Sequence, residues 1–460
     1  MAEQVRKKKI SPVELVGAHL AQIEKLNPIL NAFVQMDAER ARGAAHDAEA
    51  AVMQGKPLGP LHGVPISIKS SVDVAGMRCE AGTRLRTGLV ATQDAPLVTR
   101  LKNAGAIVLG VTNTPELLMA WETNNLLYGR TNNPWDLERT PGGSSGGEAA
   151  AIAAGMSAGG VGSDGGGSIR VPAHFSGICG LKPTPGRIPA TGHFPASAGP
   201  FALIGVVGPM ARTVADLKVL FEVMQGPDIG DTCAAPVPVR WPSEEETRKL
   251  RIGYFEDDGR TPVTPEIRAA VRTAAEALRS AGFQVDRFRP DGLEEARRLW
   301  HKFFVVAGGM LLRPMFKKND PDLSPTLKQF LERSAAKPPL TGRTLLDAWI
   351  QRDLLRARFF AQMQRYPILL CPAAAIPAFR HGERSWQIDG KTVHYLDAWS
   401  YTEFFNLLGN PAAVVPVGRS SEGLPIGVQI VGRPWEEEQV LAVAAALEQQ
   451  CAAWRIPPTA

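Results

Sequence analysis

Short apolar runs that suit buried strands alternate along this chain with longer segments of helical periodicity, and this alternation limits the possible folds most. The strand-like runs cover residues 63–69, 106–111, 206–210, 250–255 and 284–286. The helical patterns cover residues 38–53, 96–104, 148–157, 213–224 and 265–279. Strands that alternate with helices are typical of α/β proteins with a largely buried sheet. We therefore predict an α/β architecture.

The ends of some helices carry local signals. Ser11 can cap the first long helix, with Pro12 at its first position and Glu14 completing a capping box. The pair Asn27-Pro28 predicts the end of that helix, because proline cannot continue the hydrogen-bond ladder. Thr264 similarly predicts the start of the helix at 265–279.

Residues 226–249 are the weakest part of the pattern, because proline and charged residues dominate there. The segment suits either a linker between two domains or a long surface loop. Since strand and helix patterns resume on both sides, we favour a single domain over 1–460. From 300 to 361 the pattern is helical and locally very apolar. We leave open whether the stretch 300–316 is core, a pocket wall or a membrane-facing patch.

The composition argues against several classes of protein. Hydrophobic residues make up 44% of the 460 residues and charged residues 21%, which is typical of a globular protein. The net charge of +5 is small and the basic run at 6–9 stands alone, so we expect no nucleic-acid partner. No apolar run reaches the ~18 residues of a transmembrane helix, so we expect no stable membrane insertion and a cytoplasmic protein. The five cysteines form no Cys-x-x-Cys pair, which indicates reduced thiols and no metal site.

Two glycine-rich turns that contain serine give the best indication of function. Residues 142–147 read Gly-Gly-Ser-Ser-Gly-Gly, and residues 164–168 read Asp-Gly-Gly-Gly-Ser. Glycine lacks the Cβ that would keep a ligand away, so consecutive glycines can aim several backbone N–H groups at one point. Such a point binds a developing oxyanion. A serine beside it indicates acyl transfer.

Three better-known motifs fit these residues less well. Residues 142–146 match the Gly-x-Ser-x-Gly nucleophile elbow, but the residues before them do not resemble a buried strand. Residues 160–165 match the dinucleotide fingerprint, but a helical pattern precedes them and Pro172 soon follows. Residues 334–337 match Ser-x-x-Lys, without the companion Lys-Thr-Gly motif.

A serine nucleophile also needs a base, and no sequence pattern brings any of the eight histidines near these turns. Lysine can serve as the base if burial or nearby charge lowers its pKa enough to leave it neutral. Lys69 ends the apolar run 63–69 and is the natural candidate, although a lysine at a strand end is more often a surface residue.

Taken together, these segments resemble the amidase signature family of serine hydrolases. The similar segments, in the family's order and spacing, are 63–69, 110–116, 129–135, 141–147, 162–172 and 177–184. Residues 11–33, 208–212 and 424–432 are also similar, so only 226–400 departs from the family. The resemblance implies one large domain with a central mixed sheet flanked by helices on both faces. Its signature core would lie at 60–215 and its variable substrate-pocket region at 226–400.

The resemblance also implies a catalytic triad of serine, cis-serine and lysine. Ser168 would be the nucleophile, Ser144 the bridging cis-serine and Lys69 the base. The implied oxyanion hole consists of the backbone N–H groups of Gly165, Gly166, Gly167 and Ser168. The reaction would be hydrolysis of a carbon–nitrogen bond through an acyl-enzyme, with no metal and no cofactor.

Other positions match supporting roles in the family. Ser145 and Asp164 match hydrogen-bonding positions, and Arg170 matches a structural arginine. Position 165 departs from the family, which usually has threonine or another side chain there. The missing side chain predicts a more mobile loop or a wider mouth of the site.

The substrate is the least readable part of the sequence. The resemblance implies that the substrate lies near Leu118, Met119, Ala120 and Trp121, with 300–316 and 401–406 closing the cavity. Ordinary core packing explains these apolar residues equally well. Such a lining suits an apolar or aromatic amide, and the family also cleaves carbamates, so aryl amides and urethanes are the leading prediction.

Two other functions stay open at this point. The chain could be the glutaminase component of a glutamyl-tRNA amidotransferase, the A subunit, which works in a complex and releases ammonia from glutamine. It could also be a non-catalytic scaffold with the same fold, although the lysine and both serines argue against this. A homodimer is left open, because oligomeric state cannot be read from the sequence.

Overall fold

The predicted strands join one large mixed sheet. In the computed structural model, which describes residues 1–316, 322–451 and 456–459, this sheet has 11 strands in the order β1-β3-β2-β6-β8-β7-β14-β15-β11-β9-β10. Their bounds are β1 Phe33–Met36, β2 Pro65–Lys69, β3 Ile107–Thr112, β6 Gly159–Asp164, β7 Cys179–Lys182, β8 Val206–Ala211, β9 Arg251–Tyr254, β10 Gln284–Arg287, β11 Ile368–Pro372, β14 Ala412–Arg419 and β15 Pro425–Val431. The strands β3, β2 and β6 run parallel, as do β11, β9 and β10, and the other neighbouring pairs are antiparallel.

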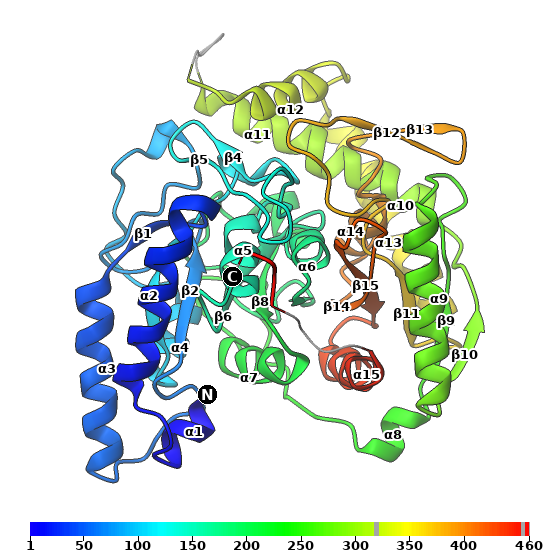
Figure 1. Ribbon diagram of the computed structural model, residues 1–460. Helices are drawn as coiled ribbons and strands as arrows, with labels where there is room; N and C mark the ends of the chain where they lie inside the picture. Colours follow the sequence, from blue (N-terminus) through cyan, green and yellow to red (C-terminus); the bar gives the residue numbers. More distant parts are fainter. Residues whose placement is uncertain (317–321, 452–455, 460) are drawn as a thin grey trace.

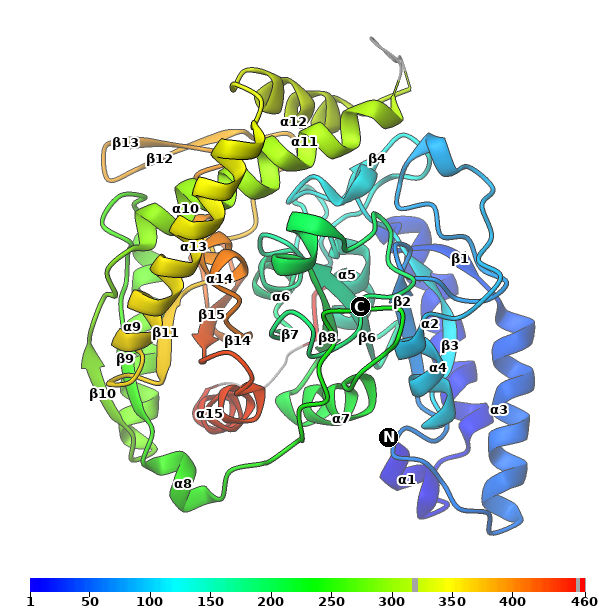
Figure 2. The same ribbon diagram turned by 180° about the vertical axis from the view of Figure 1, so that it is seen from behind.

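Helices flank this sheet, as Figures 1 and 2 show from opposite sides. The α-helices are α1 Ala2–Arg6, α2 Pro12–Leu30, α3 Ala38–Met53, α4 Pro96–Asn103, α5 Gly146–Ala153, α6 Arg170–Ser176, α7 Val214–Met224, α8 Glu244–Arg248, α9 Pro265–Ser280, α10 Leu293–Trp300, α11 Gly308–Leu312, α12 Pro325–Ala335, α13 Gly342–Gln362, α14 Ser400–Leu408 and α15 Glu437–Gln450. A π-helical turn at His301–Ala307 joins α10 to α11. Two small hairpins, β4 Asn124–Asn125 with β5 Gly129–Arg130 and β12 Ser385–Ile388 with β13 Lys391–His394, lie apart from the main sheet.

The predicted start of α2 is confirmed and its predicted end is wrong. Ser11 and Glu14 form the capping box. The helix nevertheless continues through Pro28 to Leu30 and ends at Asn31, whose φ is 49°. Proline sits there within the last turn, and the side chain of Asn27 instead accepts hydrogen bonds from the backbone beyond the helix, at 2.9 and 2.8 Å.

Two elements near the site escaped the sequence analysis. Strand β6 (Gly159–Asp164) was not predicted, because half of its residues are glycines, which ordinarily weaken a strand. Pro172, which counts against the dinucleotide fingerprint at 160–165, lies in the first turn of α6, where a missing backbone N–H costs no hydrogen bond. The predicted helix at 148–157 instead spans Gly146–Ala153, and Thr264 precedes α9 without a side-chain cap hydrogen bond.

Residues on both sides of 226–249 belong to the same domain. Strands β9, β10 and β11 follow this segment in the chain and extend the sheet already formed by the first half. The segment itself is mostly coil and contains only the short helix α8. The choice of a single domain with a loop is therefore confirmed.

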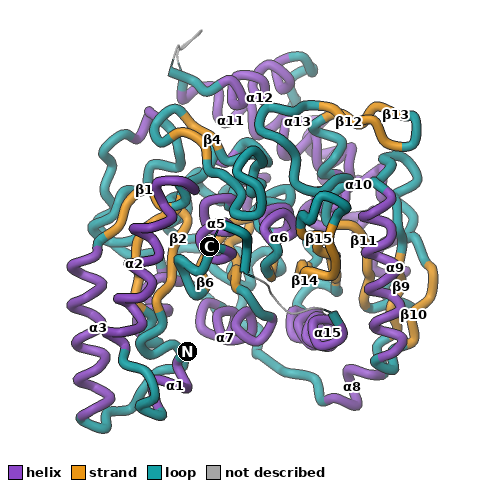
Figure 3. The backbone as a smooth tube through the Cα atoms, viewed as in Figure 1, coloured by secondary structure: helices purple, strands orange, loops and turns teal. Residues whose placement is uncertain are grey.

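The predicted helical region after residue 300 forms α11, α12 and α13, of which α13 packs against α14 through hydrogen bonds from Arg352 and Arg356 to the carbonyls of Leu407 and Leu408. Figure 3 shows α11 and α12 at the top of the view, beyond the ends of the central strands, and Figure 2 shows α13 running from there down beside α14 and β11. Within the described residues, no helix combines the length and the apolar character that crossing a membrane requires.

Candidate active site

Parallel pairing brings the two candidate segments together. Lys69 is the last residue of β2 and Asp164 the last residue of β6, and these strands are parallel neighbours with Ser67 opposite Gly160. The carboxyl ends of parallel strands meet at one edge of a sheet, which is where α/β proteins bind ligands. The turn at 164–168 therefore begins beside Lys69.

Lys69 is fully buried among serine hydroxyls. Its Nζ lies 2.7 Å from Ser144 Oγ, 2.9 Å from Ser145 Oγ and 3.0 Å from Ser163 Oγ. The side chain has no exposed surface. Ser144 follows a cis peptide bond after Gly143, as the resemblance implies for this position. The structure thus joins the proposed base directly to the proposed bridging serine.

Burial sets the protonation of Lys69. It lowers the pKa of Lys69 to about 7, although the charges of Asp164 and Glu148 favour the ammonium form. Burial likewise raises the pKa of Glu148 to about 7, against hydrogen bonds from Ser67 Oγ at 2.5 Å and Thr112 Oγ1 at 2.8 Å. A substantial share of Lys69 is therefore neutral at neutral pH and able to accept a proton.

Two tryptophan side chains hold the turn that carries Ser168 by donating hydrogen bonds to its carbonyl groups. Trp300 Nε1 donates to the carbonyl of Gly165 at 2.9 Å, and Trp121 Nε1 donates to the carbonyl of Gly166 at 2.8 Å. In a trans peptide the N–H points opposite to the C=O, so these bonds also fix the N–H of the following residue. The two indoles thereby orient the turn.

One of the four predicted oxyanion donors is already engaged. The N–H of Gly167 donates to Asp164 Oδ1 at 2.7 Å. Gly167 has a φ of 112°, and an added Cβ would lie 2.4 Å from Thr402 Oγ1, so only glycine fits there. The hydrogen bonds of the described residues leave the N–H groups of Gly165, Gly166 and Ser168 available for an oxyanion.

Asp164 is fixed by a buried ion pair. Arg170 Nη2 donates to Asp164 Oδ1 at 2.9 Å and Arg170 Nε to Oδ2 at 3.0 Å, and both side chains are fully buried. The positive charge of Arg170 and the N–H bonds of the turn hold the pKa of Asp164 well below its usual range despite burial. Asp164 and Arg170 thus stabilise the turn through this ion pair.

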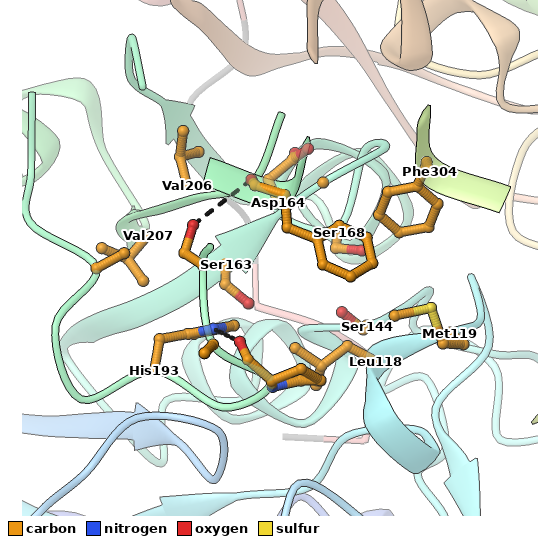
Figure 4. A pocket seen from close by; sticks show the side chains of 17 residues that line it. Leu118, Met119, Ser144, Ser163, Asp164, Ser168, His193, Val206, Val207 and Phe304 are labelled. Atoms are coloured by element: carbon orange, nitrogen blue, oxygen red, sulfur yellow. Dashed lines mark hydrogen bonds between the residues drawn. The ribbon is translucent and has the colours of Figure 1, made fainter. Parts of the chain in front are cut away.

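A cavity opens over the serines. Figure 4 shows that Ser144, Ser163 and Ser168 line it together with Leu118, Met119 and Phe304. We call this the serine cavity; it encloses about 520 Å³, solvent at its mouth included, and is also lined by Asp164, Gly165, Ala190, His193, Pro195, Ala196, Ser197, Phe201, Gly205, Val206 and Val207.

A second cavity of about 510 Å³ adjoins the first at Ser168. We call it the aromatic cavity, because Trp121, Trp300, Phe304, Phe330 and Tyr395 line it. The four predicted pocket residues all lie here: Leu118 and Met119 line both cavities, and Ala120 and Trp121 line the aromatic one.

The apolar stretch 300–316 contributes some residues to the cavity walls and exposes others at the surface. Trp300 is buried and lines the aromatic cavity, and Phe304 stacks on it with ring centroids 4.7 Å apart and lines both cavities. Met310 and Leu311 are exposed. The predicted wall at 401–406 lines neither cavity: Thr402 and Asn406 instead bind the backbone of the 164–168 turn.

The predicted wider mouth at Gly165 does not occur. A Cβ at this position would lie 2.8 Å from Phe304 Cε2, so the phenyl ring occupies the space that the family's side chain would fill. Phe304 was not predicted as the neighbour of Gly165, because the two positions lie far apart in the chain.

Sequence reasoning also missed His193, which lines the serine cavity from an irregular loop. Its Nδ1 lies 2.9 Å from the carbonyl of Pro195 and its Nε2 lies 3.3 Å from Ser71 Oγ. Burial, reinforced by the charge of Lys69, lowers the pKa of His193 to about 4. The imidazole is therefore neutral, with Nδ1 as the donor, and forms part of the wall.

The site combines a buried amine that is hydrogen-bonded to one serine with a second serine on a turn that has free N–H groups. This arrangement is typical of hydrolases in which a serine attacks an acyl carbon. Comparison with known proteins agrees. A family model described as Amidase matches residues 14–441. The chain belongs to the amidase signature family and is an amide hydrolase.

Individual relatives cover almost the whole chain. An indoleacetamide hydrolase of Bradyrhizobium diazoefficiens is 36% identical over 98% of this chain and 85% of its own length. The A subunit of a glutamyl-tRNA(Gln) amidotransferase from Synechococcus sp. strain CC9605 is 34% identical over 100% of this chain and 97% of its own length. A solved structure, described as an inhibitor-bound vestigial protein complex bearing on the origins of an s-triazine catabolic enzyme, is 31% identical with a TM-score of 0.91 and covers 98% of both chains.

Proposed function

We propose that the protein hydrolyses an amide or carbamate through Ser168, Ser144 and Lys69. Neutral Lys69 takes a proton from Ser144 as Ser144 takes one from Ser168, and Ser168 Oγ attacks the carbonyl carbon. Ser144 then gives a proton to the leaving nitrogen and regains one from the Lys69 ammonium. Water repeats the attack on the acyl-enzyme, releasing the acid and restoring Ser168. The observation that carries this proposal is the 2.7 Å hydrogen bond from a fully buried lysine to Ser144.

We assign oxyanion stabilisation to the N–H groups of Gly165, Gly166 and Ser168. Their fixed orientation suits this role, because donors that need no reorganisation stabilise the developing charge most. Asp164, Arg170 and Ser145 serve as positioning residues. Trp121 and Trp300 hold the turn and also line the aromatic cavity.

Aryl amides and urethanes remain the proposed substrates. Apolar and aromatic side chains dominate the lining of both cavities at Ser168. The similarity to an indoleacetamide hydrolase supports an aromatic amide, because indoleacetamide carries an aromatic ring on its acyl side. A turnover panel of anilides, primary amides, esters and carbamates tests this assignment.

The triad is tested by substitution and labelling. Ser168→Ala should abolish turnover and labelling by a fluorophosphonate, whereas Lys69→Ala should slow turnover by ~10²–10⁴-fold, the usual contribution of a general base. Ser71→Ala is the matched control, since Ser71 bonds His193 outside the proposed relay. An unchanged rate in Ser168→Ala or Lys69→Ala would contradict the assignment.

The similarity to an amidotransferase component keeps a second function in view. Such a component would release ammonia from glutamine only with its partner chains and tRNA. Glutaminase activity that appears only in that complex, together with no turnover of the amide panel by the isolated chain, would favour it. The non-catalytic scaffold predicts neither activity nor fluorophosphonate labelling.

The remaining expectations stay predictions. The division into a signature core at 60–215 and a variable region at 226–400 is supported by the origin of the side chains: the first supplies Lys69, Ser144 and Ser168, and the second supplies Phe304. The cytoplasmic location and the homodimer await fractionation and sedimentation experiments.

A further inference from the structure

The aromatic cavity has one charged side chain. Among the described residues that line it, the guanidinium of Arg333 stands alone in a wall that is otherwise apolar, aromatic or neutral. Helix α12 presents Arg333 to the cavity together with Thr326, Gln329 and Phe330, which recur every three or four residues and so share one helix face. This face, rather than a loop, positions the charge.

Arg333 is half-buried and has no protein partner in the described part of the chain. No ion pair and no side-chain hydrogen bond to another described residue engages its guanidinium, unlike that of Arg313, which binds the carbonyl of Leu331 on the same helix. Arg333 is one of three cations near His301: after burial, the charges of Lys337, Arg297 and Arg333 lower the pKa of His301 to about 4, against the opposing charge of Asp397. A guanidinium offers five donors in a planar fork that matches a carboxylate, and here they point to no internal acceptor.

The different linings of the two cavities that meet at Ser168 indicate which part of the substrate each cavity binds. Ser144, the proposed proton donor to the leaving nitrogen, lines the serine cavity and not the aromatic one. The leaving amine must therefore depart on the side of the serine cavity. The acyl portion, bonded to the same carbonyl carbon, then extends past Ser168 into the aromatic cavity.

We propose that the aromatic cavity binds the acyl portion of the substrate, and that Arg333 recognises a carboxylate at the far end of an aromatic acyl group. The substrate class is thus an amide of an aromatic dicarboxylic acid, in which one carboxyl forms the amide and the other is free. This rests on Ser168 being the nucleophile. Trp121, Trp300 and Tyr395 would contact the ring, and the guanidinium would bind the anion.

Matched substrates separate the effect of the carboxylate charge from the effect of its shape. The probes are 4-nitroanilides of benzoic, phenylacetic and phenylpropanoic acids that carry either a carboxylate or a nitro group at the para position. Nitro is a neutral group of nearly the same shape as carboxylate, and the three acyl lengths sample the reach to Arg333. The measured quantity is the ratio of kcat/KM for the carboxylate to kcat/KM for its nitro counterpart, at about pH 8, where both carboxylate and amine base are deprotonated.

At the best acyl length the wild-type ratio should exceed ~10, because a hydrogen-bonded charge pair is typically worth that much or more. Arg333→Gln should lower the ratio ~10-fold or more, and Arg333→Glu should bring it below one. Lys328→Gln, on the exposed face of the same helix, removes the same charge outside the cavity and should leave the ratio unaltered.

Two results would overturn the inference: a wild-type ratio at or below one at all three lengths, or an equal ratio in Arg333→Gln and the wild type. Both results are measured on substrates that Ser168 hydrolyses, so they would contradict the role of Arg333 and not the role of Ser168. If instead Ser168 is not the nucleophile, hydrolysis of both the carboxylate and the nitro probes would be unaffected by Ser168→Ala.

Discussion

Acidification should switch this enzyme off through Lys69. Burial lowers the pKa of Lys69 to about 7 from 10.5, so the neutral amine predominates only above that pH. Since the ammonium cannot accept a proton from Ser144, kcat/KM should fall ~10-fold for each pH unit below 7 and ~100-fold by about pH 5. An ordinary lysine would be only ~0.03% neutral at pH 7, and activity would keep rising beyond about pH 9.

A second buried group titrates in the same range and must be separated from Lys69. Burial raises the pKa of Glu148 to about 7, so an observed acid limb belongs to the pair unless one member is removed. Glu148→Gln removes the negative charge that favours the Lys69 ammonium; its amide keeps one acceptor oxygen for either Ser67 or Thr112, which donate to different carboxylate oxygens in the wild type. The limb should then move to lower pH. His193 does not interfere, because its pKa is about 4.

The assay is kcat/KM for an uncharged 4-nitroanilide from about pH 5 to about pH 9, with near-UV circular dichroism to verify that the fold persists. A flat profile in the wild type would refute the neutral-lysine argument. Loss of the limb in Glu148→Gln would assign the titration to the carboxyl group instead. Lys69→Ala should retain only a slow rate without this limb.

Three further perturbations have defined outcomes. The pKa of Lys69 is about 7 in the folded state and 10.5 in the unfolded state, so between these values the unfolded state binds more protons. In thermal melts, Lys69→Met should therefore be more stable than the wild type near pH 7 and lose this advantage towards pH 10. A difference that does not depend on pH would contradict this. Arg170→Met leaves the buried Asp164 carboxylate unpaired and should cost ~3–5 kcal/mol in urea unfolding, against a small change for an exposed arginine. Gly165→Ala should lower kcat/KM by crowding Phe304, and Phe304→Leu should restore part of it; additive effects would show that the two positions do not interact.

Parts of the fold could be predicted from residues that are close together in the sequence. The capping box of α2, the apolar runs of β2 and β3, and the position of Lys69 at a strand end are all local patterns. The pairing of β2 with β6, about ninety residues apart, depends on contacts that no local pattern encodes. The same holds for the wall of the aromatic cavity, which Arg333 and Ser168 line from distant parts of the chain.

The glycines that concealed β6 are also what the site requires. A Cβ at Gly160 would lie 2.1 Å from Glu148 Oε1 and 2.1 Å from the carbonyl of Ser67. Any larger residue would hold α5 away from the sheet, and α5 directly follows Ser144 and Ser145. Close approach of helix and strand is thus what places these hydroxyls on the Lys69 amine. A strand with ordinary β-forming residues here would be easier to predict and could not build this centre.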